Sequence, residues 1–128
     1  MQIALPYPPS INHYWRHCRG RVVIGKRGRT FRSDVLGQLR VDGREPINDR
    51  IAVCLDAYPP DLRRRDLDNI QKPVLDALEH AHVYRDDSQI DLLITRRMQP
   101  QRPEGRIDVR IQPLPLSVCP LCQSVMNH

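Results

Sequence analysis

The chain has 128 residues, a length that suits a single domain with one modest core. Its formal charge is +5, and only two of its twenty basic residues are lysines, so the composition favours an anionic partner that arginine can bind in a fork. No segment approaches the roughly 20 apolar residues that span a bilayer, and the N-terminus lacks the pattern of a signal peptide, so we expect a cytoplasmic protein with no membrane partner.

The N-terminal part of the chain predicts one strand and one basic element. Residues 2–5 (QIAL) have the composition of a short strand that the following prolines would end. Residues 12–29 are rich in arginine, and we expect a basic hairpin or a pair of loops there. The dipeptides Arg19-Gly20 and Arg27-Gly28 mark the expected turns.

The next two elements are a helix and a strand. We expect the helix from Thr30 to about Val41, where apolar residues recur every fourth position and form one stripe. That stripe consists of Phe31, Val35 and Leu39. Residues 50–58 alternate in polarity as a strand does, with Val53, Leu55 and Ala57 on one face.

A second helix is predicted from about Asn69 to His80, with Ile70, Val74 and Leu78 as its buried stripe. Pro73 lacks an N–H group and restricts the residue before it. It is best tolerated if the helix starts near Asn69 or if the first turn is irregular. Asp66 and Asp68 would then precede the helix in an extended or turn conformation.

Two further strands complete the predicted fold. Residues 88–98 and 106–112 look like strands joined by the turn at 99–105, with Ile107, Val109 and Ile111 facing inward. The order of elements indicates an α/β fold, a single domain with a small mixed β-sheet packed against two helices. We expect this domain to cover residues 1–113 and residues 114–128 to form a separate tail.

The acidic residues around the second helix carry the chemistry. Asp66 and Asp68 are two apart, so in an extended segment both carboxylates point the same way. Asp86 and Asp87 follow the helix, and a strand returning toward the helix start could bring them to the same end. Carboxylates that converge repel one another and raise one another's pKa, whereas Mg²⁺ or Mn²⁺ would neutralise such a cluster and activate water.

Basic residues next to these aspartates suit a phosphodiester substrate. The arginines at 63–65 could hold adjacent phosphates, and Lys72, one helical turn after Asp68, could place its ammonium beside developing negative charge. The alternative is structural: such pairs of aspartates are common on solvated turns, and the arginines could simply balance Asp61, Asp66 and Asp68.

The run RRRDLDNIQKPVLDALEHAHVYRDDSQID resembles the signature of the RusA family of Holliday-junction resolvases. The opening LPYPPSINHYWRHCRGR resembles that family's N-terminal segment, and the similarity extends from about Ile3 to Ile111. It implies a magnesium-dependent crossover junction endodeoxyribonuclease, active in DNA recombination and repair. Such an enzyme nicks opposed strands of a four-way junction as a homodimer and occurs largely in bacteria and their prophages.

The resemblance also assigns residues. It implies that Asp66, Asp68 and Asp87 are the catalytic, metal-binding aspartates, that Lys72 is the essential lysine, and that Asp86 and Asn69 support the site. The residues that we expect to contact DNA are Asn12, Tyr14, Arg16, Arg19, Arg21, Lys26, Arg27, Arg64, Arg65 and Asn69. Residues 30–45 look short for the family, and the tail lies outside the similarity.

Two features leave alternatives open. Tyr14 or Trp15 could wedge into an open junction, or Trp15 could be a core residue. Cys119 and Cys122 form half of a zinc-knuckle pattern to which His128 could add a ligand; a structural zinc needs four, and a tail with free thiols is the simpler interpretation. The competing functions are a non-catalytic basic DNA-binding module and a zinc-binding regulatory protein.

Overall fold

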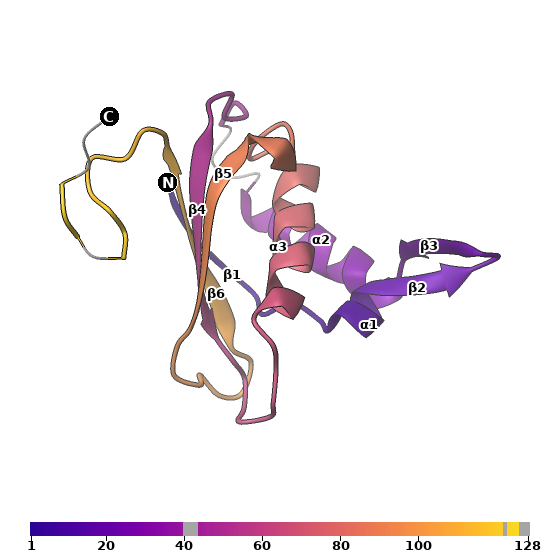
Figure 1. The fold of residues 1–128 in the computed structure, drawn as a ribbon. Helices are drawn as coiled ribbons and strands as arrows, with labels where there is room; N and C mark the ends of the chain where they lie inside the picture. Colours follow the sequence, from indigo (N-terminus) through magenta and orange to yellow (C-terminus); the bar gives the residue numbers. More distant parts are fainter. Residues whose placement is uncertain (40–43, 122, 126–128) are drawn as a thin grey trace.

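The computed structural model describes residues 1–39, 44–121 and 123–125. A four-stranded sheet forms one layer, and helices α2 and α3 lie on one side of it (Figure 1). The strands are β1 (Gln2–Leu5), β4 (Ile51–Tyr58), β5 (Ile90–Arg97) and β6 (Arg106–Pro113). Their order is β1-β6-β4-β5, with β6 antiparallel to β1 and β4 and with β4 parallel to β5. The predicted mixed sheet is therefore confirmed.

Alternation along the central strands separates the two faces of the sheet. Every second residue of β4 and β6 is buried beneath the helices, as the sequence predicts. These inward residues are Val53, Leu55, Ala57, Ile107, Val109 and Ile111. The opposite, outer face carries the polar and half-buried side chains of the same strands. Among them are Asp56 and Arg110, which lie 3.7 Å apart.

Helix α2 spans Lys26–Leu39 and so begins four residues before the predicted start. The Arg27-Gly28 dipeptide, predicted as a turn, lies inside this helix, and that prediction is wrong. A side chain on Gly28 would place its Cβ 2.4 Å from the carbonyl oxygen of Tyr14, so this glycine permits close packing rather than a turn. The residues that would end the predicted helix, 40–43, lie outside the described part of the chain.

Helix α3 spans Asp68–His80 and connects β4 to its parallel neighbour β5. Its buried stripe contains Ile70, Val74 and Leu78, as predicted, together with Pro73 and Ala77. In the first turn, the amide of Asn69 donates to the carbonyl of Asp66 (3.2 Å) and that of Ile70 to the carbonyl of Leu67 (3.1 Å). These bonds span three residues rather than four, which is the irregular first turn that Pro73 suggests.

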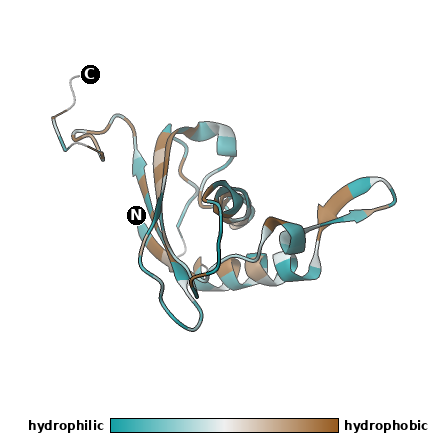
Figure 2. Cartoon of the chain, turned by 60° about the horizontal axis from the view of Figure 1, so that its bottom comes forward, coloured by the Kyte–Doolittle hydropathy of each residue, from teal (hydrophilic) through white to brown (hydrophobic). Residues whose placement is uncertain are grey.

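The basic N-terminal segment forms α1 (Ile11–Tyr14) and a hairpin of β2 (Trp15–Cys18) and β3 (Arg21–Ile24). The hairpin is a separate two-stranded sheet, and it projects away from the main sheet beyond the helices (Figure 2). Arg19 and Gly20 form its two-residue turn, with φ angles of 50° and 74°. Two consecutive positive φ angles are typical of the type I′ turn that matches strand twist, so the turn predicted at Arg19-Gly20 is confirmed.

After β6 the chain folds over the outer face of the sheet, where Leu116 is buried. Residues 114–121 and 123–125 contain no helix or strand of their own beyond a single bridge between Val118 and Val125. Within the described residues, no helix combines the length and apolar character needed to cross a membrane.

Candidate nucleic-acid interface and metal centre

Asp66 and Asp68 lie where the loop after β4 leads into α3. Asp66 is in the loop after β4, and Asp68 is the first residue of α3; both are exposed. An acidic side chain in the first turn interacts favourably with the partial positive charge of a helix N-terminus. The prediction that Asp66 precedes the helix is confirmed. Asp68 was predicted to precede it too, but it is the first residue of α3.

A cleft of about 850 Å³ opens beside this loop. The proline-rich segment before α1, the start of α2 and the loop before α3 line it. Six residues assigned to DNA or metal from the sequence share this cleft: Lys26, Arg27, Arg64, Arg65, Asp66 and Asn69. Residues far apart in the sequence thus form one hollow in which basic side chains outnumber carboxylates, a combination suited to a phosphodiester backbone near a metal.

The arginines of this loop differ in freedom. Arg65 donates to Asp61 Oδ1 (2.6 Å), and its guanidinium lies 5.6 Å from the ring centre of Tyr7. That hydrogen bond, followed by one from the backbone of Arg63, lowers the pKa of Asp61 to about 2. Arg64 is exposed and lines the same cleft. Arg65 therefore braces the loop, and Arg64 is the better placed of the two to reach a phosphate.

Tyr7 is a cleft residue that sequence reasoning missed. It lies between Pro6 and Pro8 and lines both the large cleft and a smaller adjoining hollow of about 350 Å³. Its only signal in the sequence was an aromatic residue held between prolines. The aromatic residues considered instead were Tyr14 and Trp15.

The structure does not support the expectation that Tyr14 contacts DNA, because this side chain is fully buried. Its hydroxyl donates to Asp76 of α3, and Arg32 of α2 donates to the same carboxylate (2.8 Å). Desolvation, followed by this hydrogen bond to Asp76, raises the pKa of Tyr14. Trp15 packs edge-on against Tyr14, with ring centres 4.9 Å apart. Tyr14 therefore fastens α1 to α3 instead of lying at the surface.

Asp87 occupies a different environment from Asp66 and Asp68. It begins the short 3₁₀ helix η2 (Asp87–Gln89) and is partly buried. The hydroxyl of Tyr84 donates to Asp87 Oδ1 (2.7 Å) and lies 2.9 Å from the carbonyl oxygen of Leu75 in α3. Desolvation raises the pKa of Asp87, while the Tyr84 hydrogen bond and the charge of Lys72 oppose that shift.

Asp86 has a structural use that the sequence did not reveal. The carboxylate of Asp86 accepts a hydrogen bond from the backbone amide of Ser88 (2.8 Å). The backbone amide of Asp86 in turn donates to the side-chain oxygen of Gln89 (2.9 Å). Together these bonds form a capping box at the start of η2. The hydrogen bonds from Ser88 lower the pKa of Asp86. One oxygen of this predicted metal ligand is thus already engaged.

The two parts of the signature do not meet in one chain. In a β-α-β unit the helix runs opposite to its strands, so a residue before α3 and a residue between α3 and β5 lie toward opposite edges of the sheet. Through Tyr84, Asp87 contacts α3 at Leu75, which is about 10 Å along the helix axis from Asp68. Among the described residues, no three histidine, cysteine or acidic side chains are close enough to hold one metal ion.

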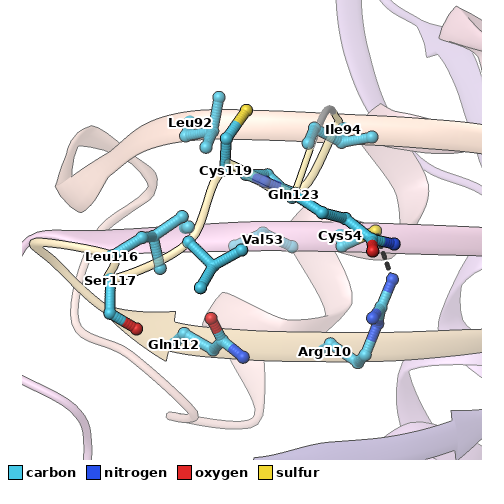
Figure 3. Close-up of a pocket in the computed structure, with 13 residues that line it drawn as sticks. Val53, Cys54, Leu92, Ile94, Arg110, Gln112, Leu116, Ser117, Cys119 and Gln123 are labelled. Carbon is cyan, nitrogen blue, oxygen red and sulfur yellow. Dashed lines mark hydrogen bonds between the residues drawn. The ribbon is translucent and has the colours of Figure 1, made fainter. Parts of the chain in front are cut away.

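Another hollow, of about 370 Å³, lies on the outer face of the sheet beneath the tail (Figure 3). Its lining mixes polar side chains with apolar ones such as Leu92 and Ile94 of β5, and Arg110 donates there to the Sγ atom of Cys54 (3.1 Å). No carboxylate lines it. Cys119 lines this hollow, whereas Cys122 and His128 lie outside the described residues, so the possible zinc site stays a prediction.

Comparison with known proteins identifies relatives of the whole described domain. The family model described as endodeoxyribonuclease RusA matches residues 6–112. The crossover junction endodeoxyribonuclease rusA of Enterobacteria phage HK97 is 42% identical over 117 residues, covering 88% of this chain and 94% of the relative. The proteins of the same name from Shigella sonnei (strain Ss046) and Escherichia coli (strain K12) are 38% and 37% identical over 115 residues, covering 85% of this chain and 91% of each relative.

Proposed function

The chain belongs to the RusA family of endodeoxyribonucleases, and from that premise we propose that it resolves Holliday junctions by paired nicks in opposed strands during DNA recombination and repair. The observation that carries the proposal is the cleft at the start of α3, where Asp66 lies among Arg64, Lys26 and Arg27. Arginine and lysine at this position can hold the phosphates that flank a scissile bond. Relatives encoded by phages support a prophage origin.

The family is one of divalent-metal nucleases, and we infer that the ion is Mg²⁺, for which Mn²⁺ could substitute. Asp66, Asp68 and Asp87 would hold it, with Asp86 nearby. The donor set fits a hard cation because it consists of carboxylate oxygens, two of which are on exposed residues. When bound, the ion supplies an activated water and neutralises charge on the phosphodiester. Lys72 would stabilise negative charge that develops during cleavage.

We propose that the active protein is a homodimer. A four-way junction has approximate two-fold symmetry, so paired nicks are most simply made by a two-fold enzyme. The distribution of the aspartates supports this proposal from another side. One chain separates Asp87 from Asp66 and Asp68, and a second copy that offers its own Asp87 to the start of α3 would complete the set of ligands.

The decisive experiment compares a synthetic four-way junction with a linear duplex of matched sequence, with Mg²⁺ and with excess EDTA. We expect Mg²⁺-dependent nicks at symmetric positions in opposed strands of the junction and little cutting of the duplex. Asp68→Asn should bind the junction and not cut it, because binding depends on many arginine–phosphate contacts. Full activity in EDTA, or equal cutting of both substrates, contradicts the proposal.

The same experiment separates the competing functions. A non-catalytic DNA-binding module would bind both substrates with a steep salt dependence and cut neither. A zinc-binding regulator would carry stoichiometric zinc that a chelator removes. For that outcome the Cys119–Cys122 pair is the place to look, and deletion of residues 114–128 would test whether residues 1–113 act as an independent endonuclease domain.

A further inference from the structure

The hairpin of β2 and β3 is not explained by the fold or by the cleft. It forms a sheet of only two strands and projects from the body in both views of the chain (Figures 1 and 2). A two-stranded hairpin is at best marginally stable in water, so its outer part adds little to the stability of the domain. A projection that contributes little to the fold suggests a surface that acts on something outside the chain.

The register of the hairpin sorts its side chains onto two faces. Trp15 pairs with Ile24 and His17 with Val22, so these four side chains share one face. The inner part of this face packs against the core through Trp15 and Ile24. Arg16 pairs with Val23 and Cys18 with Arg21, so both arginines lie on the other face. They are diagonal neighbours, ~7–8 Å apart, close enough for their guanidinium groups to grip neighbouring phosphates.

The charge around the hairpin selects the partner. Residues 1–33 contain no aspartate or glutamate. Their seven lysine and arginine residues are Arg16, Arg19, Arg21, Lys26, Arg27, Arg29 and Arg32. Arg16 and Arg21 on the hairpin face and Arg19 in its turn are exposed. A positively charged surface of this kind attracts a polyanion and repels cations.

The root of the hairpin is firmly held. The amide of Gly25 donates to the carbonyl of Tyr14 (2.7 Å), and the hydroxyl of Tyr14 donates to Asp76. Asp76 lies one turn beyond Lys72 on α3. The projecting strands are thus fixed to the helix that carries the candidate catalytic lysine, so a ligand on the hairpin has a defined position relative to the cleft.

We propose that the β2–β3 hairpin is an arm that lies along the phosphate backbone of a duplex flanking the branch point, through Arg16, Arg21 and Arg19. This inference rests on the proposed function and deepens it. The arm lies outside the cleft, so one linear duplex seated in the cleft does not also fill the arm. In a branched molecule, duplexes diverge in several directions, so one can occupy the cleft while another contacts the arm. The hairpin then supplies preference for branched over linear DNA.

The test is a double variant, Arg16→Gln with Arg21→Gln, compared with Val22→Thr on the opposite face, where Val22 is 60% exposed. Binding to a four-way junction and to a matched linear duplex is measured by fluorescence anisotropy in EDTA over a range of salt. We expect the double variant to lose at least tenfold in junction affinity, with a salt slope reduced by about two. The duplex should lose less, and Val22→Thr should match wild type.

Each other outcome overturns the inference. Unchanged junction affinity and slope would remove the hairpin from the interface. An equal loss on junction and duplex would make it a general phosphate contact without branch preference. If the double variant without DNA sediments differently from wild type, the hairpin would be assigned to contact between copies of the chain. These measurements report binding and do not depend on cutting. A wild-type protein that binds junctions and never nicks them would therefore contradict the proposed function, while the hairpin test could still be interpreted.

Discussion

Lys72 stands between the two parts of the acidic signature. It lies one helical turn after Asp68, and its charge acts on the carboxyl of Asp87. A cation aimed at developing charge acts mainly in the transition state. We therefore expect Lys72→Ala to lower the single-turnover cutting rate far more than it lowers junction affinity.

The only other lysine in the chain provides a matched comparison. Lys26 lines the cleft, so Lys26→Ala should weaken junction binding and leave the rate of the bound complex nearer to wild type. Affinity and single-turnover rate are measured separately for both variants. If lost affinity accounts for the whole defect of Lys72→Ala, then Lys72 is an ordinary phosphate contact.

Tyr84 orients Asp87 through its hydroxyl, and Tyr84 is itself fully buried. Tyr84→Phe removes this hydrogen bond and should lower the free energy of unfolding by ~1 kcal/mol. The released carboxylate should also bind metal less well, so the Mg²⁺ concentration needed for half-maximal cutting should rise. Tyr58→Phe, on the outer face of the sheet, should leave the Mg²⁺ dependence unchanged. An equal Mg²⁺ requirement in Tyr84→Phe and wild type would reduce Tyr84 to a structural role.

At the scale of single residues, the sequence was informative where chemistry is local. Arg64, Arg65, Asp66 and Asn69 line one cleft because they are close in the chain, whereas Lys72 and Asp87 of the same signature do not line it. Tyr14 was assigned to the surface because its neighbours are arginines, yet its hydroxyl finds Asp76, which is 62 positions away. Nothing in the sequence around Tyr14 or Asp76 indicates that the two side chains are paired. Only the fold shows that Tyr14 is buried and that Tyr7 is the aromatic residue that lines the cleft.

At the scale of elements, α2 offers a test of close packing. A Cβ on Gly28 would lie 2.4 Å from the carbonyl oxygen of Tyr14 and 2.8 Å from Ile24, whereas a Cβ on Gly37 would meet nothing within 4 Å. Gly28→Ala should therefore destabilise the protein by ~1–3 kcal/mol. Gly37→Ala should stabilise it by ~0.5–1 kcal/mol, since alanine favours the helix. Urea unfolding of both variants checks the opposite signs, and two stabilising alanines would show that α1 and α2 can separate.

The outer face of the sheet carries a second stabilising element. Asp56 accepts two hydrogen bonds from Arg96, at 2.8 and 2.9 Å, which lower the pKa of Asp56 below its ordinary value of 3.8. A lowered folded-state pKa contributes stability that is present above the unfolded-state pKa and lost as the pH falls through the folded-state value. Asp56→Asn should therefore cost ~1 kcal/mol at pH 7, allowing for the half-exposed Arg96.

This cost should shrink as the pH falls below about 4, where the carboxyl of the unfolded chain takes up a proton, and should disappear once the pH falls below the lowered folded-state pKa. Urea unfolding of wild type and Asp56→Asn at several pH values measures the difference. A gap that stays constant down to pH 2 would mean that the Arg96 contact does not depend on the charge of Asp56.

Elements with a clear period were predicted well. The buried stripes of β4, β6 and α3 follow from alternation and helical spacing, and the hairpin turn follows from Arg19-Gly20. The start of α2 was missed because Gly28 resembles a turn signal locally. Its actual reason is the carbonyl of Tyr14 on another element, which only tertiary packing reveals.

At the scale of the whole molecule, connectivity explains why the predicted metal site is incomplete in one chain. The sequence suggested that the strand after α3 could return Asp87 to the helix start. Asp87 precedes that strand, as expected, and it therefore remains toward the edge where α3 ends, held there through Tyr84. Spacing along a chain shows which residues belong to a motif, but it does not determine how far apart the fold places them.

Mixed dimers test the arrangement directly. Asp68→Asn and Asp87→Asn should each abolish cutting as homodimers. If each site combines Asp66 and Asp68 of one copy with Asp87 of the other, a dimer of one Asp68→Asn chain and one Asp87→Asn chain contains one intact site and one doubly altered site. Such a dimer, purified through two different tags, should nick a four-way junction in one strand only and leave the opposed strand whole. If each chain supplies its own complete site, both sites of the mixed dimer are altered and it should be as inactive as its parents. Sedimentation that shows a monomer at micromolar concentration, with and without junction DNA, would rule out the dimer and with it the shared site.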